Sequence, residues 1–341
     1  MAKNFKQSFK EILITFGPAV IILVFGFWLA SRFISPAPPK KIVMATGETT
    51  GAYYKFADRY RQELAQKGIE VEIKTTTGSL ENIDLLLQGK ADVAFVQGGT
   101  GKEGENLLSL GSLYYEPVWI FLNRQIAAEQ LKDYDDLIIS IGEKGSGTSV
   151  VAKKLLEMND IDNKSATLVT MNSSTAMENL LQHKIDAAFF VSSTQSTIIQ
   201  KLLKDDRVHL LNMSRAEAYS YLMPYLSKIT LAEGIIDLNQ NIPSRDIAMI
   251  APTANLAINE DLHSALQILL LEAAKKIHGG PGLFSDPGTF PSSYKTAFPL
   301  SEIAERYYKV GPPFLMRYLP FWAAVLIDRM VVMICLLYTS D

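Results

Sequence analysis

Two glycine-rich turns hold the residues whose types and spacing best suit ligand binding. Each turn lies between a predicted strand and a predicted helix, at residues 46–51 and 142–148. The unbonded amides and the dipole at a helix start attract an anion. The second turn has the Walker A spacing without its lysine, and Val150 stands where a dinucleotide fingerprint needs glycine. The turns therefore indicate a site for a small anion other than a nucleotide, with tight turns that bind nothing as the alternative.

Polar residues also occupy strand and helix ends in both halves of the chain. Gln97 ends a buried strand, at the edge where open α/β sheets place their ligands, and Ser192 holds the equivalent place in the second half. Ser79 begins a predicted helix, with Asn82 at its third helical position, and either caps that helix or binds a ligand. Tyr54 points away from the apolar stripe of its helix and could form the wall of a cleft.

The composition excludes several other functions. The chain has 341 residues, 48% hydrophobic and 20% charged, so it can bury a large core and is not disordered. A net charge of -3 without a long basic stretch argues against nucleic acid as a partner. One cysteine, Cys335, and four scattered histidines argue against a disulfide scaffold and a transition-metal site. The adjacent Asp135 and Asp136 fit a solvated loop better than a catalytic acid–base pair, so no enzyme activity is expected.

The body of the chain shows the same order of strand and helix patterns twice. Its first half predicts strands at 41–45, 69–75 and 91–96 with helices at 52–66 and 79–88, and the second half repeats this order from 137 to 191. This order indicates a parallel sheet with helices on its faces. Laying residues 86–97 over 180–191 matches seven of twelve positions at an offset of 94, which also brings Gly51 onto Gly145. We therefore predict an α/β protein with two similar lobes and a cleft between them.

The remaining elements predict how the two lobes are connected. A long apolar strand at 247–258 suits a return to the first lobe, and residues 115–122 suit the outward crossing. We expect the first lobe to comprise 41–130 and the second 131–246, with 247–310 returning to the first lobe. Two crossings of this kind form a two-stranded hinge.

The N-terminus predicts a membrane anchor. Residues 12–31 run for 20 residues without a charge, which at about 1.5 Å per residue spans a hydrocarbon core of roughly 30 Å. Lysines precede this stretch, so the positive-inside rule leaves residues 1–10 in the cytoplasm and the body of the protein on the periplasmic side of the inner membrane. We expect an anchor at 11–34 in the lipid bilayer and a stiff proline-rich linker at 35–40. The alternative is a cleaved signal peptide.

The C-terminal residues form a second, less regular apolar stretch. Residues 311–334 are interrupted by Arg317, Asp328 and Arg329, which favours an amphipathic segment at the membrane surface followed by the start of a second span. Residues 335–341 resemble the translation of a sequencing adapter. We therefore expect the natural chain to continue beyond 334 and Cys335 to be an artefact.

The motifs together resemble a known family of transport proteins. Residues 45–54 (ATGETTGAYY), 76–97 (TTGSLENIDLLLQGKADVAFVQ) and 142–149 (GEKGSGTS) are similar to the TAXI-type solute-binding subunits of TRAP transporters. Residues 110–121 and 317–329 resemble a membrane-anchored branch of that family with a second C-terminal span. The resemblance covers about residues 40–330. It implies a two-lobed type II periplasmic-binding-protein fold that closes on a small carboxylate and delivers it to the TRAP membrane permease subunits.

The resemblance also implies which residues bind the ligand. Carried over by motif, with Ser192 added from its strand-end position, the predicted contacts are Thr46, Gly47, Gly51, Tyr53, Gly78, Ser79, Asn82, Gln97, Ser146, Gly147, Thr148 and Ser192. Residues 98–100 (Gly-Gly-Thr) depart from the family pattern, in which many relatives carry a serine and an acidic residue after the glutamine. The ligand stays open among amino acids, four-carbon dicarboxylates and 2-oxo acids, because no arginine can be assigned to clamp it. No cofactor or metal is expected, and a membrane-anchored ligand-sensing receptor of the same fold is the alternative function.

Overall fold

The computed structural model describes residues 38–319 apart from 50, 102–103 and 127–129, together with 321, 323–324 and 327. The compact unit that carries the sheets is residues 39–311. The predicted anchor at 11–34, the tail before it and residues 335–341 lie outside the described residues. Of the predicted C-terminal membrane segment, the structure describes the short helix α10 (Phe314–Tyr318) and a few residues after it. No helix in the described part of the chain is long and apolar enough to cross a bilayer.

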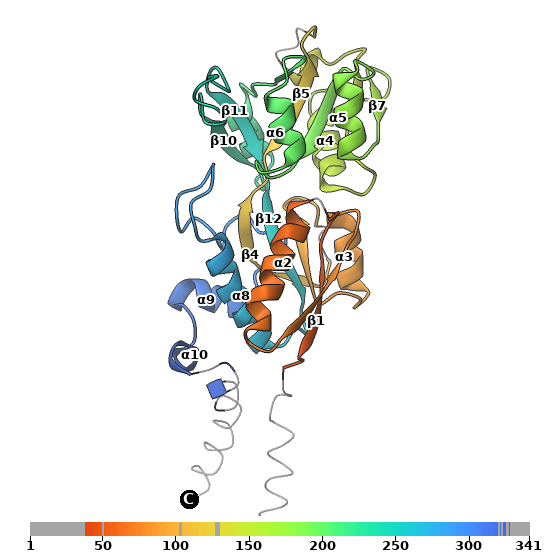
Figure 1. The fold of residues 1–341 in the computed structure, drawn as a ribbon. Coiled ribbons are helices and arrows are strands. Elements are labelled where there is room, and N and C mark those ends of the chain that lie inside the picture. Colours follow the sequence, from red (N-terminus) through yellow and green to blue (C-terminus); the bar gives the residue numbers. More distant parts are fainter. Residues whose placement is uncertain are drawn as a thin grey trace, which may run out of the picture. The chain divides into compact units, whose positions relative to one another are not determined.

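The sheet of the first lobe has five strands in the order β2-β1-β3-β12-β4 (Figure 1). These strands are β1 (Lys41–Ala45), β2 (Glu70–Lys74), β3 (Val93–Gln97), β4 (Leu107–Tyr115) and β12 (Thr253–Asn259). β1 pairs in parallel with β2 and β3, whereas β12 runs antiparallel to β3 and β4. Along β3, Phe95 packs against aromatic rings of one helix while Ala94 and Val96 enter the core cluster on the other face. Burial on both faces explains the uninterrupted apolar sequence of this strand.

The sheet of the second lobe has the order β7-β6-β8-β5-β9. Its strands are β5 (Val118–Asn123), β6 (Ile138–Ser140), β7 (Thr167–Val169), β8 (Ala187–Val191) and β9 (Val208–Leu210). A separate antiparallel ribbon joins β10 (Ser227–Leu231) to β11 (Ile247–Ala251). Alternate residues of β5 enter two different cores, with Ile120 in one and Trp119 and Phe121 in the other. This lobe is therefore a sheet with a packed apolar layer on each face.

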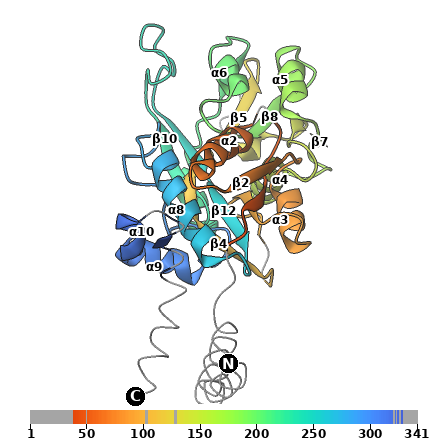
Figure 2. The ribbon, with the colours of Figure 1, turned by 60° about the horizontal axis from the view of Figure 1, so that its bottom comes forward.

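Helices surround both sheets. Those of the first lobe are α2 (Ala52–Ala65), α3 (Ser79–Leu87), α8 (Ser264–His278) and α9 (Glu302–Val310). Those of the second lobe are the short 3-10 helix η1 (Leu131–Asp133), α4 (Gly147–Glu157), α5 (Ser173–Leu181), α6 (Thr197–Leu203) and α7 (Ala216–Leu222). In Figures 1 and 2, α2 lies beside α8, although the two helices are about 200 residues apart in the chain. The first lobe is thus completed by a segment that comes late in the chain.

The two lobes repeat one topology, as the sequence repeat predicts. In each sheet, three parallel strands are extended by an antiparallel strand, β12 in the first lobe and β5 in the second. The helix α3 and strand β3 correspond to α5 and β8 with the predicted offset of 94 at every boundary. At the first helix of each lobe the N-cap residues are Gly51 and Ser146, so Ser146, not Gly145, is the structural equivalent of Gly51. The predicted two-lobed α/β fold is confirmed.

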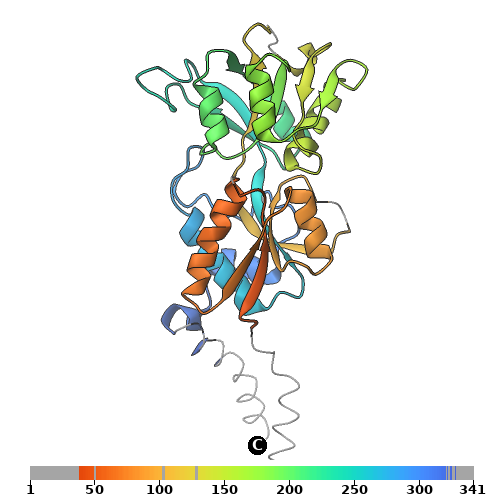
Figure 3. The same cartoon turned by 45° about the vertical axis from the view of Figure 1, so that its right-hand side comes forward.

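The chain crosses between the lobes within the two predicted segments, 115–122 and 247–258, but the boundary of the first lobe and the strands at the return differ from those expected. The first lobe was expected to extend to 130, but β5 pairs with β8 and β9 in the second sheet, so the outward crossing lies at Glu116 and Pro117. The apolar run 247–258 was expected to be one strand, but it forms β11 and β12 in different sheets, with Pro252 between them. Proline has no amide hydrogen and so interrupts strand pairing at this point. Figure 3 shows the crossing segments, in yellow-orange and cyan, between the two lobes.

Gly111, in the middle of β4, allows a close approach that no other residue permits. Its φ is +129°, and a Cβ atom there would collide with the Tyr308 hydroxyl and come within 2.8 Å of the Ser292 carbonyl. Tyr308 itself donates a hydrogen bond of 2.8 Å to the Leu110 carbonyl, which fastens α9 to the sheet.

We expect Gly111→Ala to lower the free energy of unfolding by at least about 2 kcal/mol, because it combines backbone strain with a steric collision. Urea unfolding followed by circular dichroism measures this loss. Gly280→Ala is the matched control, since its Cβ would meet nothing within 4 Å. Equal stability of the two variants would contradict the role assigned to Gly111.

Candidate functional site

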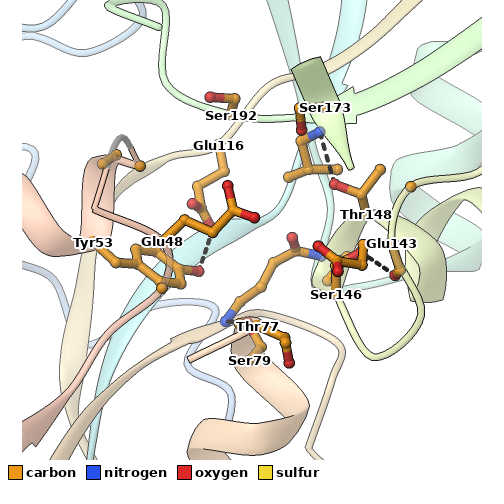
Figure 4. Close-up of a pocket in the computed structure, with 18 residues that line it drawn as sticks. Glu48, Tyr53, Thr77, Ser79, Glu116, Glu143, Ser146, Thr148, Ser173 and Ser192 are labelled. Carbon is orange, nitrogen blue, oxygen red and sulfur yellow. Dashed lines mark hydrogen bonds between the residues drawn. The ribbon is translucent and has the colours of Figure 1, made fainter. Parts of the chain in front are cut away.

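A cavity of about 170 Å³ lies between the two lobes, within residues 39–311. This volume suits a ligand of small-metabolite size, since one water molecule occupies about 30 Å³ in the liquid. Figure 4 shows side chains from the first lobe, such as Tyr53 and Ser79, and from the second, such as Ser146 and Thr148, around it. The residues that line the cavity are Gly47, Glu48, Gly51, Ala52, Tyr53, Thr77, Gly78, Ser79, Gln97, Glu116, Gly142, Glu143, Ser146, Gly147, Thr148, Ser173, Val191 and Ser192.

Four helices begin at the wall of this cavity. The starts of α2 and α3 line it from the first lobe, and the starts of α4 and α5 line it from the second. The amides of a first helical turn have no acceptor within the helix, and the helix dipole places positive charge there. The N-cap residues of α2 and α3 are Gly51 and Gly78, which have no side chain to accept a hydrogen bond from these amides. The arrangement can therefore hold an anionic group with backbone donors from both lobes.

The Ser146 hydroxyl makes its hydrogen bonds at the start of its own helix. Its hydroxyl accepts a hydrogen bond of 3.2 Å from the Ser149 amide and donates one of 2.7 Å to the Glu143 carbonyl. The side chain thus acts as an N-cap. The amides of Gly147 and Thr148, one and two residues into the helix, remain as the donors that α4 can offer. The predicted direct contact from the Ser146 hydroxyl is therefore less favourable than contact through the backbone beside it.

Ser79 is not the helix cap that the sequence suggested. The N-cap of α3 is Gly78, whose φ of 129° suits glycine, and Ser79 is the first helical residue. The Ser79 hydroxyl accepts a hydrogen bond of 3.0 Å from the backbone amide of Gln97. The residue Ser79 is 2% exposed. This bond fixes the start of α3 against the end of β3.

Gln97 makes a direct contact between the lobes at the cavity. Its Nε2 atom donates a hydrogen bond of 3.1 Å to the carbonyl of Gly147, at the first residue of α4. A Cβ atom at Gly147 would meet the end of the Gln97 side chain, so this end could keep its present position only with glycine at residue 147. The two residues therefore form one wall of the cavity together.

Thr46 and Asn82, which were predicted to bind the ligand, do not line the cavity. Both are fully buried. The Asn82 amide nitrogen donates hydrogen bonds to the carbonyls of Thr46 and Phe95, and its oxygen accepts one of 2.7 Å from the Thr76 hydroxyl. These bonds tie the ends of β1 and β3 to α3. Asn82 is thus a structural residue of the first lobe.

The other ten predicted residues do line the cavity: Gly47, Gly51, Tyr53, Gly78, Ser79, Gln97, Ser146, Gly147, Thr148 and Ser192. Thr148 and Ser192 have structural hydrogen bonds, as Ser79 and Ser146 do. The Thr148 hydroxyl accepts a bond of 3.1 Å from the Val191 amide, and the Ser192 carbonyl accepts one of 2.9 Å from the indole of Trp119. Tyr54, which could have walled a cleft, does not line it.

Glu116 is the main residue that sequence reasoning missed. It lies at the outward crossing, is 5% exposed, and accepts a hydrogen bond of 2.8 Å from the Tyr53 hydroxyl (Figure 4). Burial raises the pKa of Glu116 from its ordinary 4.5 to about 8, with the bond from Tyr53 opposing the rise. Burial also raises the pKa of Tyr53 well above 10, and the nearby Glu116 adds to that rise. A single acidic residue in the apolar run YEPVWIFL was the signal that could have identified it.

The charged residues that line the cavity are all acidic. Glu48, Glu116 and Glu143 line the cavity, and none of its described lining residues is lysine, arginine or histidine. Lys55 and Arg59 of α2 help to line an adjoining cavity of about 180 Å³. Among the residues that the structure describes, no three His, Cys, Asp or Glu side chains gather where they could hold a metal ion.

Comparison with protein families identifies the chain at the level of the family. The model of the NMT1-like family matches residues 44–310, which include both sheets and the cavity. The chain belongs to the NMT1-like family. The resemblance of this NMT1-like chain to the TAXI-type subunits of TRAP transporters stays a prediction.

Several solved structures are similar to the NMT1-like chain in fold. They include an ancestral arginine-binding protein bound to arginine, which is 13% identical, with 71% of this chain and 93% of that chain covered and a TM-score of 0.47. The periplasmic aliphatic sulphonate binding protein SsuA from Escherichia coli is 12% identical, with coverage of 71% and 69% and a TM-score of 0.47. The Synechocystis PCC6803 CcmR regulatory domain in complex with 2-PG is 15% identical, with coverage of 70% and 97% and a TM-score of 0.46.

The raised pKa of Glu116 makes stability depend on pH in the ligand-free protein. The folded chain favours the neutral carboxyl, so this stabilisation is complete below about pH 4.5 and is lost as the pH rises toward 8. Between pH 5 and 8, we expect the native chain to lose about 1 kcal/mol of unfolding free energy per pH unit relative to Glu116→Gln, because glutamine does not ionise. Urea unfolding at four pH values measures the difference. Glu260→Gln, an exposed change in the same lobe, should track the native chain, and parallel profiles for all three would contradict the prediction.

Proposed function

We propose that this NMT1-like chain is an extracytoplasmic solute-binding subunit that captures a small carboxylate by lobe closure. The observation that carries the proposal is the convergence of four helix starts, two from each lobe, on one cavity of small-metabolite size. Backbone amides there can bond the carboxylate oxygens, and the dipoles of the helices favour a negative charge. Because both lobes contribute donors, the ligand is bound most tightly when the lobes are closed, and ligand binding stabilises the closed arrangement.

The segments that cross between the lobes support closure as a movement of two bodies. Each lobe has its own core, and the chain passes between the lobes at Glu116–Pro117 and at Pro252. A few residues at such crossings can absorb the change in backbone angles while the sheets stay rigid. The hydrogen bond from Gln97 to Gly147 joins the two lobes at the cavity, and a contact of this kind would support the closed arrangement.

The partners follow from the resemblance of the glycine turns to TAXI-type subunits. We infer that the loaded protein delivers its carboxylate to TRAP membrane permease subunits, which use an ion gradient for transport. The predicted anchor at 11–34 would hold the protein on the periplasmic face of the inner membrane, with its N-terminus in the cytoplasm. An anchored receptor that delivers to a permease needs no diffusion through the periplasm, since the anchor raises its effective concentration at the permease.

We expect Gly147→Val to abolish ligand binding while the lobes stay folded, because the valine side chain would collide with Gln97 and cover the amides of α4. Thermal-shift assays with glutamate, succinate and 2-oxoglutarate measure this on the purified chain. A bound member of the panel at 100 times its Kd should stabilise the native chain by about 2.7 kcal/mol. Gly280→Val, in open space, should keep the shift. Binding by Gly147→Val equal to that of the control would place the ligand elsewhere, and no shift with any acid would refute the carboxylate-binding function.

The membrane anchor is tested independently of the ligand. We expect mass spectrometry of the membrane fraction to find the natural protein with residues 12–31 retained, because this uncharged stretch is longer than the core of a cleaved signal peptide, which is about 7–15 residues. A mature chain that begins near Ser35 would show instead that the segment is removed.

A further inference from the structure

The cavity has donors for an anion at one part of its wall and acceptors at another. The helix starts supply backbone N–H groups, whereas Glu48, Glu116 and Glu143 supply carboxyl groups. Two of these differ from Glu116 in their environment, because Glu48 is exposed and Glu143 is half-buried. Glu116 alone among the three is buried and held in place by a hydrogen bond from Tyr53. It is therefore the carboxyl group that a ligand inside the cavity would meet in a fixed position.

Glu116 has no cationic partner in the described structure. Its Oε2 atom accepts the bond from Tyr53, and no hydrogen bond to its Oε1 atom or ion pair to its carboxyl is made by the described residues. The groups that face it are Tyr53 of α2, Tyr114 of β4 and, across the lining, Glu48 and Glu143. None of these carries a positive charge. A buried carboxylate without a partner is costly, so the site calls for a cation or a proton.

We propose that Glu116 receives a protonated amine of the ligand, and that binding of this amine drives the proton of the Glu116 carboxyl into solvent. The inference rests on the proposed carboxylate-binding function and narrows its ligand to molecules that carry an ammonium and a carboxylate together. An ammonium offers three donors and a positive charge to the Oε1 side of Glu116. A second carboxylate or a 2-oxo oxygen can only accept a hydrogen bond, so either could be held at this place by the neutral carboxyl alone, with no proton released. Proton release therefore distinguishes an ammonium from these two groups.

The number of protons released on binding follows from the protonation state of Glu116 before and after binding. Because burial raises the pKa of Glu116 to about 8, the carboxyl is neutral at pH 7 in the empty cavity. The ammonium favours the ionised form, so one proton leaves for the buffer as the ion pair forms. His278, which stacks on Tyr114, does not contribute, because burial lowers its pKa to about 3 and keeps it neutral in this range. The phenol of Tyr53 stays protonated because its pKa is raised.

Titration calorimetry on the purified full chain tests the inference with matched probe pairs. The pairs are alanine with pyruvate, glutamate with 2-oxoglutarate, and leucine with 4-methyl-2-oxopentanoate, so the members of each pair differ at the amine. We expect at least one amine member to bind, and its 2-oxo partner to bind at least tenfold more weakly. Measured in phosphate and in Tris at pH 7, binding should release close to one proton. The affinity should rise by up to about tenfold per pH unit below pH 8.

Glu116→Gln separates the charge from the shape of this side chain. The variant should release no proton and bind the amine probe at least tenfold more weakly at pH 8, while Glu260→Gln keeps both properties. Equal affinity for the amine and the 2-oxo member, or binding without proton release by the native chain, would overturn the role of Glu116 and leave carboxylate binding intact. If no member of any pair binds, the small-carboxylate function fails and the inference fails with it. If protons are taken up on binding, Glu116 acts as a neutral donor and the inference is wrong.

Discussion

A backbone hydrogen bond of 2.9 Å from the Glu116 amide to the Pro252 carbonyl joins the outward and the return crossing of the chain. Each crossing delivers a strand to the other sheet, since β5 and β12 are the antiparallel strands that extend the second and the first lobe. The position of the antiparallel strand in each sheet is therefore set by the same pair of segments. Because the carboxyl ends of the parallel strands face this junction, the helices that follow them begin at the cavity.

The junction also explains why the cavity combines opposite polarities. Helix starts arise in both lobes from the repeated topology, and they bring positive dipole ends. The crossing contributes a residue that belongs to neither repeat, and that residue is Glu116. A duplicated lobe alone would give a symmetric, anion-attracting cleft. The asymmetry of the cavity thus comes from the connection between the lobes.

Sequence reasoning predicted the repeated parts well, because their signal is periodic and local. Apolar patterns and the offset of 94 predicted α3 with β3 and α5 with β8, and the glycine turns lie at the cavity as expected. Both crossings lie within the segments that the sequence indicated, but the first lobe ends before β5 instead of at 130. The change of sheet at Pro252 was missed because this residue alone separates β11 from β12, which leaves the apolar pattern unbroken. Hydrogen-bond roles were beyond the sequence as well. Whether Ser146 bonds its own helix or a ligand depends on the position of the Glu143 carbonyl, and Tyr53 meets Glu116 across 63 residues of chain.

The placement of β12 between β3 and β4 has a consequence for how the protein is made. Pairs such as Gln97 with Ala254 join residues roughly 150 positions apart, and contacts of this range slow folding because a large loop must close first. The second lobe is one continuous stretch between the crossings, so it can fold as soon as it has been synthesised. The first lobe must wait, with β3 and β4 exposing unpaired edges, until residues 253–259 arrive. During synthesis, the lobe that begins first is therefore completed last.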